Sequence, residues 1–213
     1  MPKCVIFCAG SFDGLAAPIE KDDYIIAADG GLHHVESLGI PPHAVLGDFD
    51  SLGYVPAGAE VFPVEKDDTD SMLAVRKALA LGYQEIWIYG GLDGARLDHT
   101  LSNLQVLQYL ANQGAVGYLI GLTAIATVVQ EEAITFPKGA EGILSAFCVG
   151  PDATGVTITS LQYPMKNGAL TAAYPLGVSN HFIGEEATIS VERGSLLLLY
   201  PKEVGFPTGR CKI

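Results

Sequence analysis

The sequence predicts an α/β protein: an N-terminal, doubly wound and mostly parallel sheet domain, followed by a C-terminal β-sandwich or barrel domain. In the first half, short continuous apolar runs alternate with amphipathic helical segments, which is typical of a parallel sheet covered on both faces. After about residue 125 the helical period disappears, and short apolar runs follow one another between turn residues. Nearly half of the 213 residues are apolar, enough for packed cores. We therefore expect two domains, at residues 1–124 and 125–213.

Five strands and two amphipathic helices are expected in the N-terminal domain, beside a surface-like helix that contains His33 and His34. The strands are the apolar runs at 4–9, 24–28, 44–46, 85–89 and 116–120. The first helix runs over 69–81, because Thr69 can cap its start, and its apolar face carries Met72, Val75 and Leu79. The second helix runs over about 98–112. Its buried stripe is expected to consist of five leucines: Leu97, Leu101, Leu104, Leu107 and Leu110.

Seven short strands are expected in the C-terminal domain. They are the apolar runs at 127–130, 133–136, 143–149, 156–161, 169–173, 187–191 and 195–200. Turn signals such as Pro137-Lys138-Gly139 separate them, and this close spacing favours a sandwich or small barrel. The polar segment 177–182 is interpreted, from spacing alone, as a structural loop.

Charge and cysteine content narrow the classes of partner and compartment. The formal net charge is −12, so we expect no nucleic-acid partner and no anionic membrane surface. The cysteines form no CxxC pair, and Cys4 and Cys8 lie in an apolar run, which favours buried free thiols over zinc ligands. The chain shows neither a signal peptide nor an apolar span long enough for a membrane. These features predict a cytoplasmic, reduced protein.

Acidic residues form two ordered clusters. In Asp48-Phe49-Asp50 the carboxylates are two positions apart, so an extended chain would point both to one side and Phe49 into the protein. The second cluster opens the first expected helix and reads Asp67-Asp68-Thr69-Asp70. Oxygen-only ligands of this kind suit Mg²⁺, which is usually shared with substrate phosphates. We therefore expect a metal or phosphate role for Asp70.

Simpler interpretations of both clusters stay open. Aspartate is common in turns, and a helix start favours acidic residues through capping and the helix dipole. Capping can satisfy one or two of these residues but does not explain three carboxylates together. Ser51 could cap or coordinate, and Lys66 could contact a phosphate, although a lone lysine is more often solvated.

A glycine-rich turn follows the strand at 85–89. Gly90-Gly91-x-x-Gly94 is neither a dinucleotide fingerprint nor a Walker motif, but a glycine-rich turn beside an acidic site suggests phosphate handling. Arg96 is the only lysine or arginine between Lys77 and Lys138, and it could bridge phosphates while Asp98 holds metal or substrate. An Arg96–Asp98 surface ion pair is the alternative. The Asp29-Gly30-Gly31 segment offers another helix start for an anion.

Taken together and in this order, these residues resemble the thiamine pyrophosphokinase family. The likeness covers nearly the whole chain. Its elements are Ala28-Asp29-Gly30-Gly31, Gly47-Asp48-Phe49-Asp50-Ser51, Asp67-Asp68-Thr69-Asp70, the segment 90–99, Leu161-Gln162-Tyr163-Pro164-Met165 and Ser179-Asn180. One departure is Ser160, which stands where the family pattern has glycine.

The resemblance implies an N-terminal domain that binds Mg-ATP and a C-terminal domain that helps to hold thiamine at a homodimer interface. It implies that Mg²⁺ is bound by Asp48, Asp50 and Asp70. It also implies nucleotide contacts from Thr69, Arg96 and Asp98, and thiamine contacts from Ser179 and Asn180.

The reaction implied is attack of the thiamine hydroxyl on the β-phosphorus of ATP, giving thiamine diphosphate and AMP. Such an in-line displacement needs positioning and charge neutralisation more than covalent chemistry. Two alternatives stay open. The acidic clusters alone would also serve a Mg²⁺-dependent nucleotide phosphohydrolase, and a non-catalytic nucleotide sensor would need neither turnover nor all three aspartates.

Overall fold

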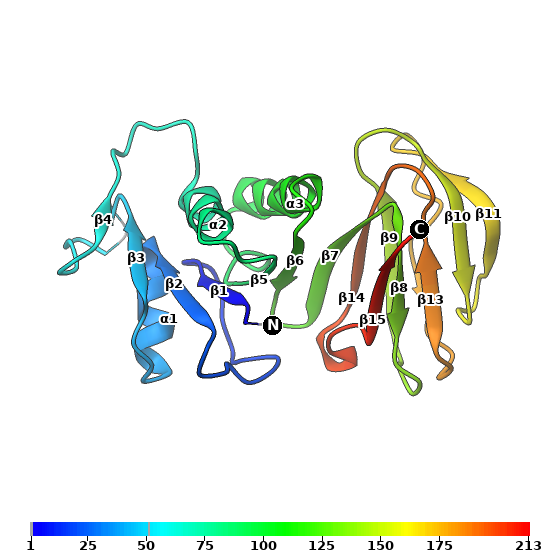
Figure 1. The fold of residues 1–213 in the computed structure, drawn as a ribbon, viewed down its shortest axis with the longest axis horizontal. Helices are drawn as coiled ribbons and strands as arrows, with labels where there is room; N and C mark the ends of the chain where they lie inside the picture. The colour runs from blue at the N-terminus through cyan, green and yellow to red at the C-terminus, as the bar shows by residue number, and fades with distance from the viewer. Residues whose placement is uncertain (1, 51) are drawn as a thin grey trace. The chain divides into compact units, whose positions relative to one another are not determined.

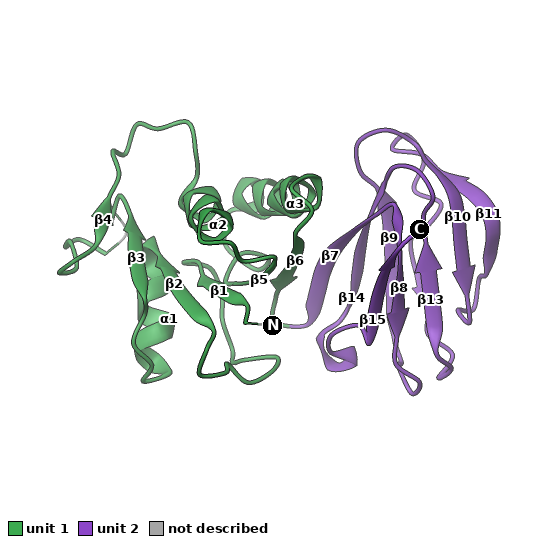
Figure 2. Ribbon diagram, viewed as in Figure 1, with its two compact units in different colours: residues 1–122 green, residues 123–213 purple. Residues whose placement is uncertain are grey.

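The computed structural model describes residues 2–50 and 52–213 and divides the chain into two compact units, residues 1–122 and 123–213 (Figures 1 and 2). The first unit is an α/β unit with a parallel sheet, and the second is built of antiparallel strands. The predicted fold class is therefore confirmed. Among the described residues, the helices are too short or too polar to span a bilayer.

The strands of the first unit lie in the order β6-β5-β1-β2-β3-β4, and every neighbouring pair is parallel. Their bounds are β1 Cys4–Phe7, β2 Tyr24–Ala28, β3 Ala44–Gly47, β4 Glu60–Val61, β5 Glu85–Tyr89 and β6 Val116–Ile120. The central strands β1, β2 and β5 are almost wholly buried, as expected for continuous apolar runs. The two-residue strand β4 contains no apolar run, so the sequence does not predict it.

Helices cover this sheet and connect its strands. Their bounds are η1 Asp29–Gly31, α1 Leu32–Ser37, α2 Asp70–Ala80 and α3 Leu97–Asn112. Helices α2 and α3 pack side by side (Figure 1), with α2 against β1, β2 and β3 and α3 against β6. Close packing on β6 needs Gly117, because a Cβ there would lie 2.6 Å from Leu110 Cδ1.

The predicted leucine stripe of α3 is wrong in its first two turns. Leu97 is 70% exposed and Leu101 is 56% exposed, whereas Leu107 and Leu110 are buried. Leu107 and Leu110 pack against Gly117 of β6, and the buried face of the helix also includes Asn103 and Val106. On α2, Val75 is buried as predicted, but Met72 and Leu79 are only partly covered. Small residues make up most of the α2 face that packs inward: Ser71, Ala74 and Ala78.

The second unit contains two antiparallel sets of strands, ordered β12-β9-β14-β7 and β11-β10-β13-β8-β15. Their bounds are β7 Ala124–Gln130, β8 Glu132–Phe136, β9 Ile143–Cys148, β10 Ala153–Thr159, β11 Met165–Leu170, β12 Asn180–His181, β13 Ala187–Ser190, β14 Ser195–Pro201 and β15 Gly209–Lys212. Phe136 of β8 makes an edge contact with Tyr200 of β14, with ring centroids 4.9 Å apart. This core contact joins the two sets of strands, as expected of a sandwich.

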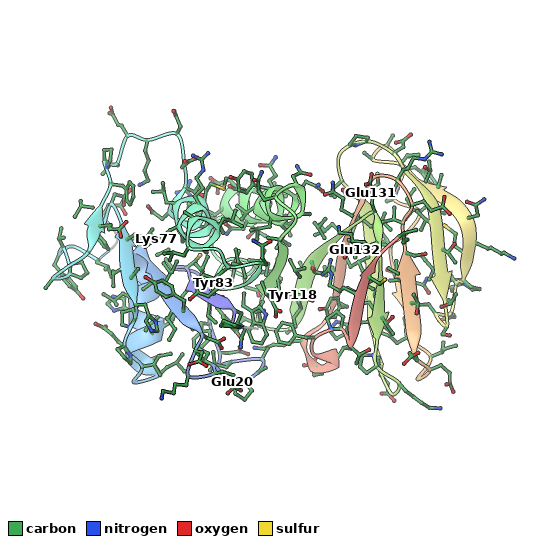
Figure 3. All side chains as sticks on the ribbon, in the orientation of Figure 1. Glu20, Lys77, Tyr83, Tyr118, Glu131 and Glu132 are labelled. Carbon is green, nitrogen blue, oxygen red and sulfur yellow. The ribbon has the colours of Figure 1, made fainter. Side chains whose placement is uncertain are left out.

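The sequence does not predict two strands of this unit, β12 and β15, and the bounds that it predicts for β11 are wrong. Strand β12 lies within the segment that was interpreted as a loop, and β11 begins at Met165 instead of 169. Strand β15 is polar, so it carries no apolar signal. It is held by Arg210, which forms a 2.5 Å ion pair with Glu132 at the start of β8 (Figure 3) and donates to Thr127 at 3.0 Å.

Ser160, the residue that departs from the family pattern, has a φ of 56°. This left-handed conformation costs a side chain with a Cβ roughly 1–2 kcal/mol but costs glycine nothing. The glycine that the resemblance leads us to expect here would relieve this strain, which the chain carries between β10 and the bridge residue Leu161.

Candidate functional site

A cleft of about 660 Å³ lies in the first unit, at the carboxyl ends of its parallel strands. Its walls come from the segments that follow β1, β2, β3 and β5 and from the starts of α2 and α3. Open α/β sheets bind ligands at this edge, because the loops after neighbouring strands converge there. The cleft brings together most of the polar motifs that the sequence places after strands.

Three carboxylates gather on one side of the cleft. One ligand atom each from Asp29, Asp48 and Asp50 lies within 4.8 Å of the others. The register explains this, because Ala28 pairs with Leu46, so the residues that follow β2 and β3 lie beside each other. Gly47 permits the approach, since a Cβ there would lie 3.1 Å from the backbone nitrogen of Asp29.

The Asp48–Asp50 segment forms a turn, and it also places both of its carboxylates in the three-carboxylate group. The Asp50 amide donates to Asp48 Oδ1 at 3.3 Å, so the turn interpretation holds for the backbone. Phe49 is buried, as expected, although its φ of 60° shows that the segment is not extended. Ser51 lies outside the described residues. An all-oxygen set of carboxylates fits a hard divalent cation such as Mg²⁺.

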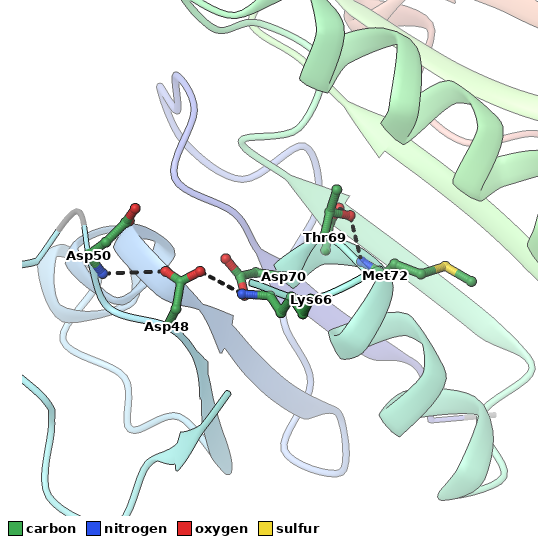
Figure 4. A network of polar contacts seen from close by, with 7 residues as sticks. Asp48, Asp50, Lys66, Thr69, Asp70 and Met72 are labelled. Atoms are coloured by element: carbon green, nitrogen blue, oxygen red, sulfur yellow. Dashed lines mark hydrogen bonds and ion pairs between the residues drawn. The ribbon is translucent and has the colours of Figure 1, made fainter. Parts of the chain in front are cut away.

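Lys66 joins the two predicted acidic clusters (Figure 4). Its Nζ lies 2.5 Å from Asp48 Oδ2 and 3.0 Å from Asp70 Oδ1. The hydrogen bond from Lys66 is the main reason why the pKa of Asp48 lies below its usual range. Burial, together with the charges of Asp48 and Asp29, raises the pKa of Asp70 despite the lysine. The charged form of Asp70 is therefore disfavoured in the cation-free cleft.

The start of α2 is capped as predicted. Thr69 Oγ1 accepts from the Met72 amide at 3.3 Å (Figure 4), and Asp70 occupies the first turn. Asp68 pairs instead with Arg76, at 3.1 Å. Asp68, Thr69 and Asp70 all line the cleft, whereas Asp67 is exposed and is not part of its wall.

A buried hydrogen-bond chain ties this helix start to the glycine turn. Ser71 Oγ donates to Asn103 Oδ1 at 2.7 Å, and Asn103 Nδ2 donates to the Gly91 carbonyl at 2.9 Å. Gly90 has a φ of 68°, and a Cβ there would lie 2.2 Å from the Cys8 carbonyl oxygen, so only glycine fits. Sequence reasoning missed Asn103. The available signal was a polar residue at a position on the buried face of α3.

Arg96 and Asp98 form the surface ion pair that was the alternative interpretation. Arg96 Nη2 lies 2.6 Å from Asp98 Oδ2, and both side chains are about two-thirds exposed. Arg96 and His99 nevertheless line the cleft. Of the segment after β2, Asp29 reaches the cleft. Gly31 instead packs beneath it, because a Cβ there would meet the Phe7 carbonyl oxygen at 1.9 Å.

Ser179 and Asn180 belong to the second unit. Asn180 is buried, and its Oδ1 accepts from the Tyr163 amide at 2.9 Å while its Nδ2 donates to the Tyr163 carbonyl at 2.8 Å. The amide group therefore fixes the loop at Tyr163. Ser179 is exposed, with a φ of 61°, and its backbone amide donates to Ser145 Oγ at 3.1 Å.

Comparisons with known proteins match both halves of the chain. Residues 15–118 match the thiamin pyrophosphokinase catalytic domain, and residues 131–196 match the vitamin B1 binding domain of the same enzymes. The thiamine pyrophosphokinase of Bacillus subtilis (strain 168) is 30% identical over 191 residues, which are 82% of this chain and 85% of the relative.

Solved structures agree with this match. The thiamine pyrophosphokinase structure from Bacillus subtilis superposes with a TM-score of 0.79 and 26% identity, covering 93% of this chain and 99% of that one. A thiamin pyrophosphokinase family protein from Enterococcus faecalis gives a TM-score of 0.78 and 27% identity, covering 93% and 98%. The thiamin pyrophosphokinase of Candida albicans shares the fold at 14% identity, with a TM-score of 0.74 over 94% and 88%.

Proposed function

The chain belongs to the thiamin pyrophosphokinase family, as its motifs predict, and from this premise we propose that it transfers the pyrophosphoryl group of ATP to the hydroxyl of thiamine. The products are thiamine diphosphate and AMP. One observation carries this proposal: the carboxylates and the Gly90-Gly91 turn that line the cleft all lie within the part of the chain that matches the catalytic domain of the family. Residues 131–196, in the second unit, match the vitamin-binding domain of the family.

We propose that Asp48, Asp50 and Asp70 hold Mg²⁺, with Asp29 beside them. The support is the close approach of carboxylate oxygens from Asp29, Asp48 and Asp50 and the position of Asp70 across Lys66. When bound, the ion would offset phosphate charge and polarise phosphoryl oxygens. The acidic side chains themselves bind and orient this charge, and their mutual repulsion favours any cation that enters.

The nucleotide phosphates are proposed to lie along the Gly90-Gly91 turn and the start of α2. Both segments line the cleft, and the chain from Ser71 through Asn103 to Gly91 holds them in fixed relation. Arg96 is exposed and lines the same cleft, so its guanidinium can leave Asp98 and form a bidentate contact with phosphate oxygens. Thr69 and Asp98 are the further nucleotide contacts that family membership suggests.

Ser179 and Asn180 are proposed to form part of the thiamine site, in different ways. Asn180 positions the loop at Tyr163, whereas Ser179 is exposed and can offer its hydroxyl to the vitamin. A homodimer that completes this site is supported by large apolar side chains exposed on the second unit. These are Ile143, Tyr163, Tyr174, Leu176, Val178, Ile183 and Ile213.

Product analysis tests this function. The protein is incubated with Mg-ATP, with and without thiamine, and AMP is separated from ADP by chromatography. We expect AMP, formed only when thiamine is present. Phosphate or pyrophosphate release without thiamine would favour the phosphohydrolase, nucleotide binding without turnover would favour the sensor, and thiamine-dependent ADP would make the protein an ordinary kinase.

A further inference from the structure

Lys66 contacts two carboxylates, and neither helix capping nor core packing explains this pair of contacts. Its ammonium bridges Asp48, which follows β3, and Asp70, the first residue of α2. The Lys66 and Asp48 side chains are only 12% and 10% exposed, so this contact is far better shielded than an ordinary surface ion pair. Figure 4 shows the ammonium held between the two carboxylates, where a bridging cation would serve the same oxygens.

Lys66 balances only part of the charge around it. Asp29 and Asp50 stand beside Asp48 in the three-carboxylate group, and Asp70 is the second carboxylate that the Lys66 ammonium contacts. A divalent cation would bring more charge to the same oxygens. Lysine could not keep both of its contacts then, because two positive charges on shared ligands repel each other.

A displaced Lys66 would stay inside the cleft. Its side chain is part of the cleft wall, and its flexible four-carbon stem carries three rotatable donors. The group that then needs such a donor is a phosphate of the bound nucleotide. From this geometry we infer that Lys66 is the cleft's internal counter-ion, displaced from Asp48 and Asp70 by the divalent cation and transferred to a nucleotide phosphate. This inference rests on the proposed function.

Removing the ammonium should change two affinities in opposite directions. Without Lys66 the ammonium no longer competes with the cation for Asp48 and Asp70, so cation binding should tighten. The phosphate loses a donor, so nucleotide binding should weaken. A lysine with a merely structural role would weaken both affinities or change neither.

Manganese serves as the probe, because free Mn²⁺ can be counted by its electron paramagnetic resonance signal during a titration without nucleotide. We expect Lys66→Met to bind Mn²⁺ at least roughly tenfold more tightly than wild type. Lys66→Arg keeps the charge and should stay near wild type. The matched control is Lys77→Met, on helix α2, where Lys77 (Figure 3) pairs with Glu60 outside the cleft wall.

A second titration measures ADP binding at saturating Mn²⁺ by equilibrium dialysis, and Lys66→Met should bind ADP several-fold more weakly. Thermal unfolding checks that each variant is folded, and Lys66→Gln replaces Lys66→Met if the latter is not. Equal or weaker Mn²⁺ binding by the folded variant overturns the inference, as does a wild type that binds no Mn²⁺. Neither titration needs turnover, so a wild type that makes no AMP refutes the proposed function and not the lysine role.

Discussion

Replacing Asn103 with leucine should destabilise the first unit strongly, because Asn103 is the middle of a buried hydrogen-bond chain. The change removes the bonds to Ser71 Oγ and the Gly91 carbonyl, at 2.7 and 2.9 Å, without leaving a large cavity. Each abandoned partner costs about 1–3 kcal/mol when it stays buried and unsatisfied. Since the cleft can hydrate part of this loss, we expect a decrease of about 2–4 kcal/mol in the free energy of unfolding.

The assay is urea unfolding followed by the fluorescence of Trp87, the only tryptophan, which lies in β5 and reports on the first unit. Ser71→Ala and the double variant complete a cycle, in which we expect a coupling of about 1 kcal/mol. Asn112→Leu, an exposed position on the same helix, should change stability by less than about 0.5 kcal/mol. A loss below about 1 kcal/mol for Asn103→Leu, with no coupling to Ser71, would refute the reasoning.

Three further predictions follow from the site and the backbone. Asp70→Asn should raise the cation-free melting temperature at neutral pH, since burial and neighbouring carboxylates raise the pKa of Asp70 and its charged form therefore destabilises the fold. The gain should shrink as the pH falls through that raised pKa, and calorimetry that finds a pH-independent loss would contradict this. Ser160→Gly should stabilise the second unit by about 1 kcal/mol in urea unfolding followed by far-ultraviolet circular dichroism, because the left-handed φ no longer carries a Cβ; a destabilised variant would exclude strain there. Arg96→Lys should lower kcat with little change in thiamine affinity, because lysine cannot form a bidentate contact with phosphate. Unaltered kcat/KM for ATP would instead leave Arg96 as the surface partner of Asp98.

The parallel sheet was largely predictable because its strands are continuous apolar runs. The bounds predicted for β2, β5 and β6 agree with the structure. A strand of a parallel sheet is buried on both faces, so its apolar run spans the whole strand and marks both of its ends. Prediction failed where the signal depends on neighbours. Leu97 and Leu101 follow the helical period of α3 but are exposed, because the period does not say how far along the helix the packing extends. The polar strand β15 carries no apolar signal, and its Arg210 pairs with Glu132, which is distant in sequence.

The same distinction holds for the site. The positions of acidic residues after strands could be read from the sequence, and so could the cap at Thr69. The approach of Asp29 to Asp48 could not, because it depends on β2 and β3 being neighbours in register. The bridging of Asp48 and Asp70 by Lys66 likewise depends on the path of the segment between β4 and α2.

The fate of each phosphorus atom of ATP tests the central claim most directly. Two reactions are run with thiamine and Mg²⁺, one with ATP radiolabelled at the β-phosphorus and one with ATP labelled at the γ-phosphorus, and products are separated by chromatography. We predict that both labels enter thiamine diphosphate in amounts equal to the AMP formed, and that Asp48→Asn, folded as wild type, transfers neither. Label that appears as free phosphate or pyrophosphate, or γ-label alone on thiamine, would contradict intact pyrophosphoryl transfer in this cleft.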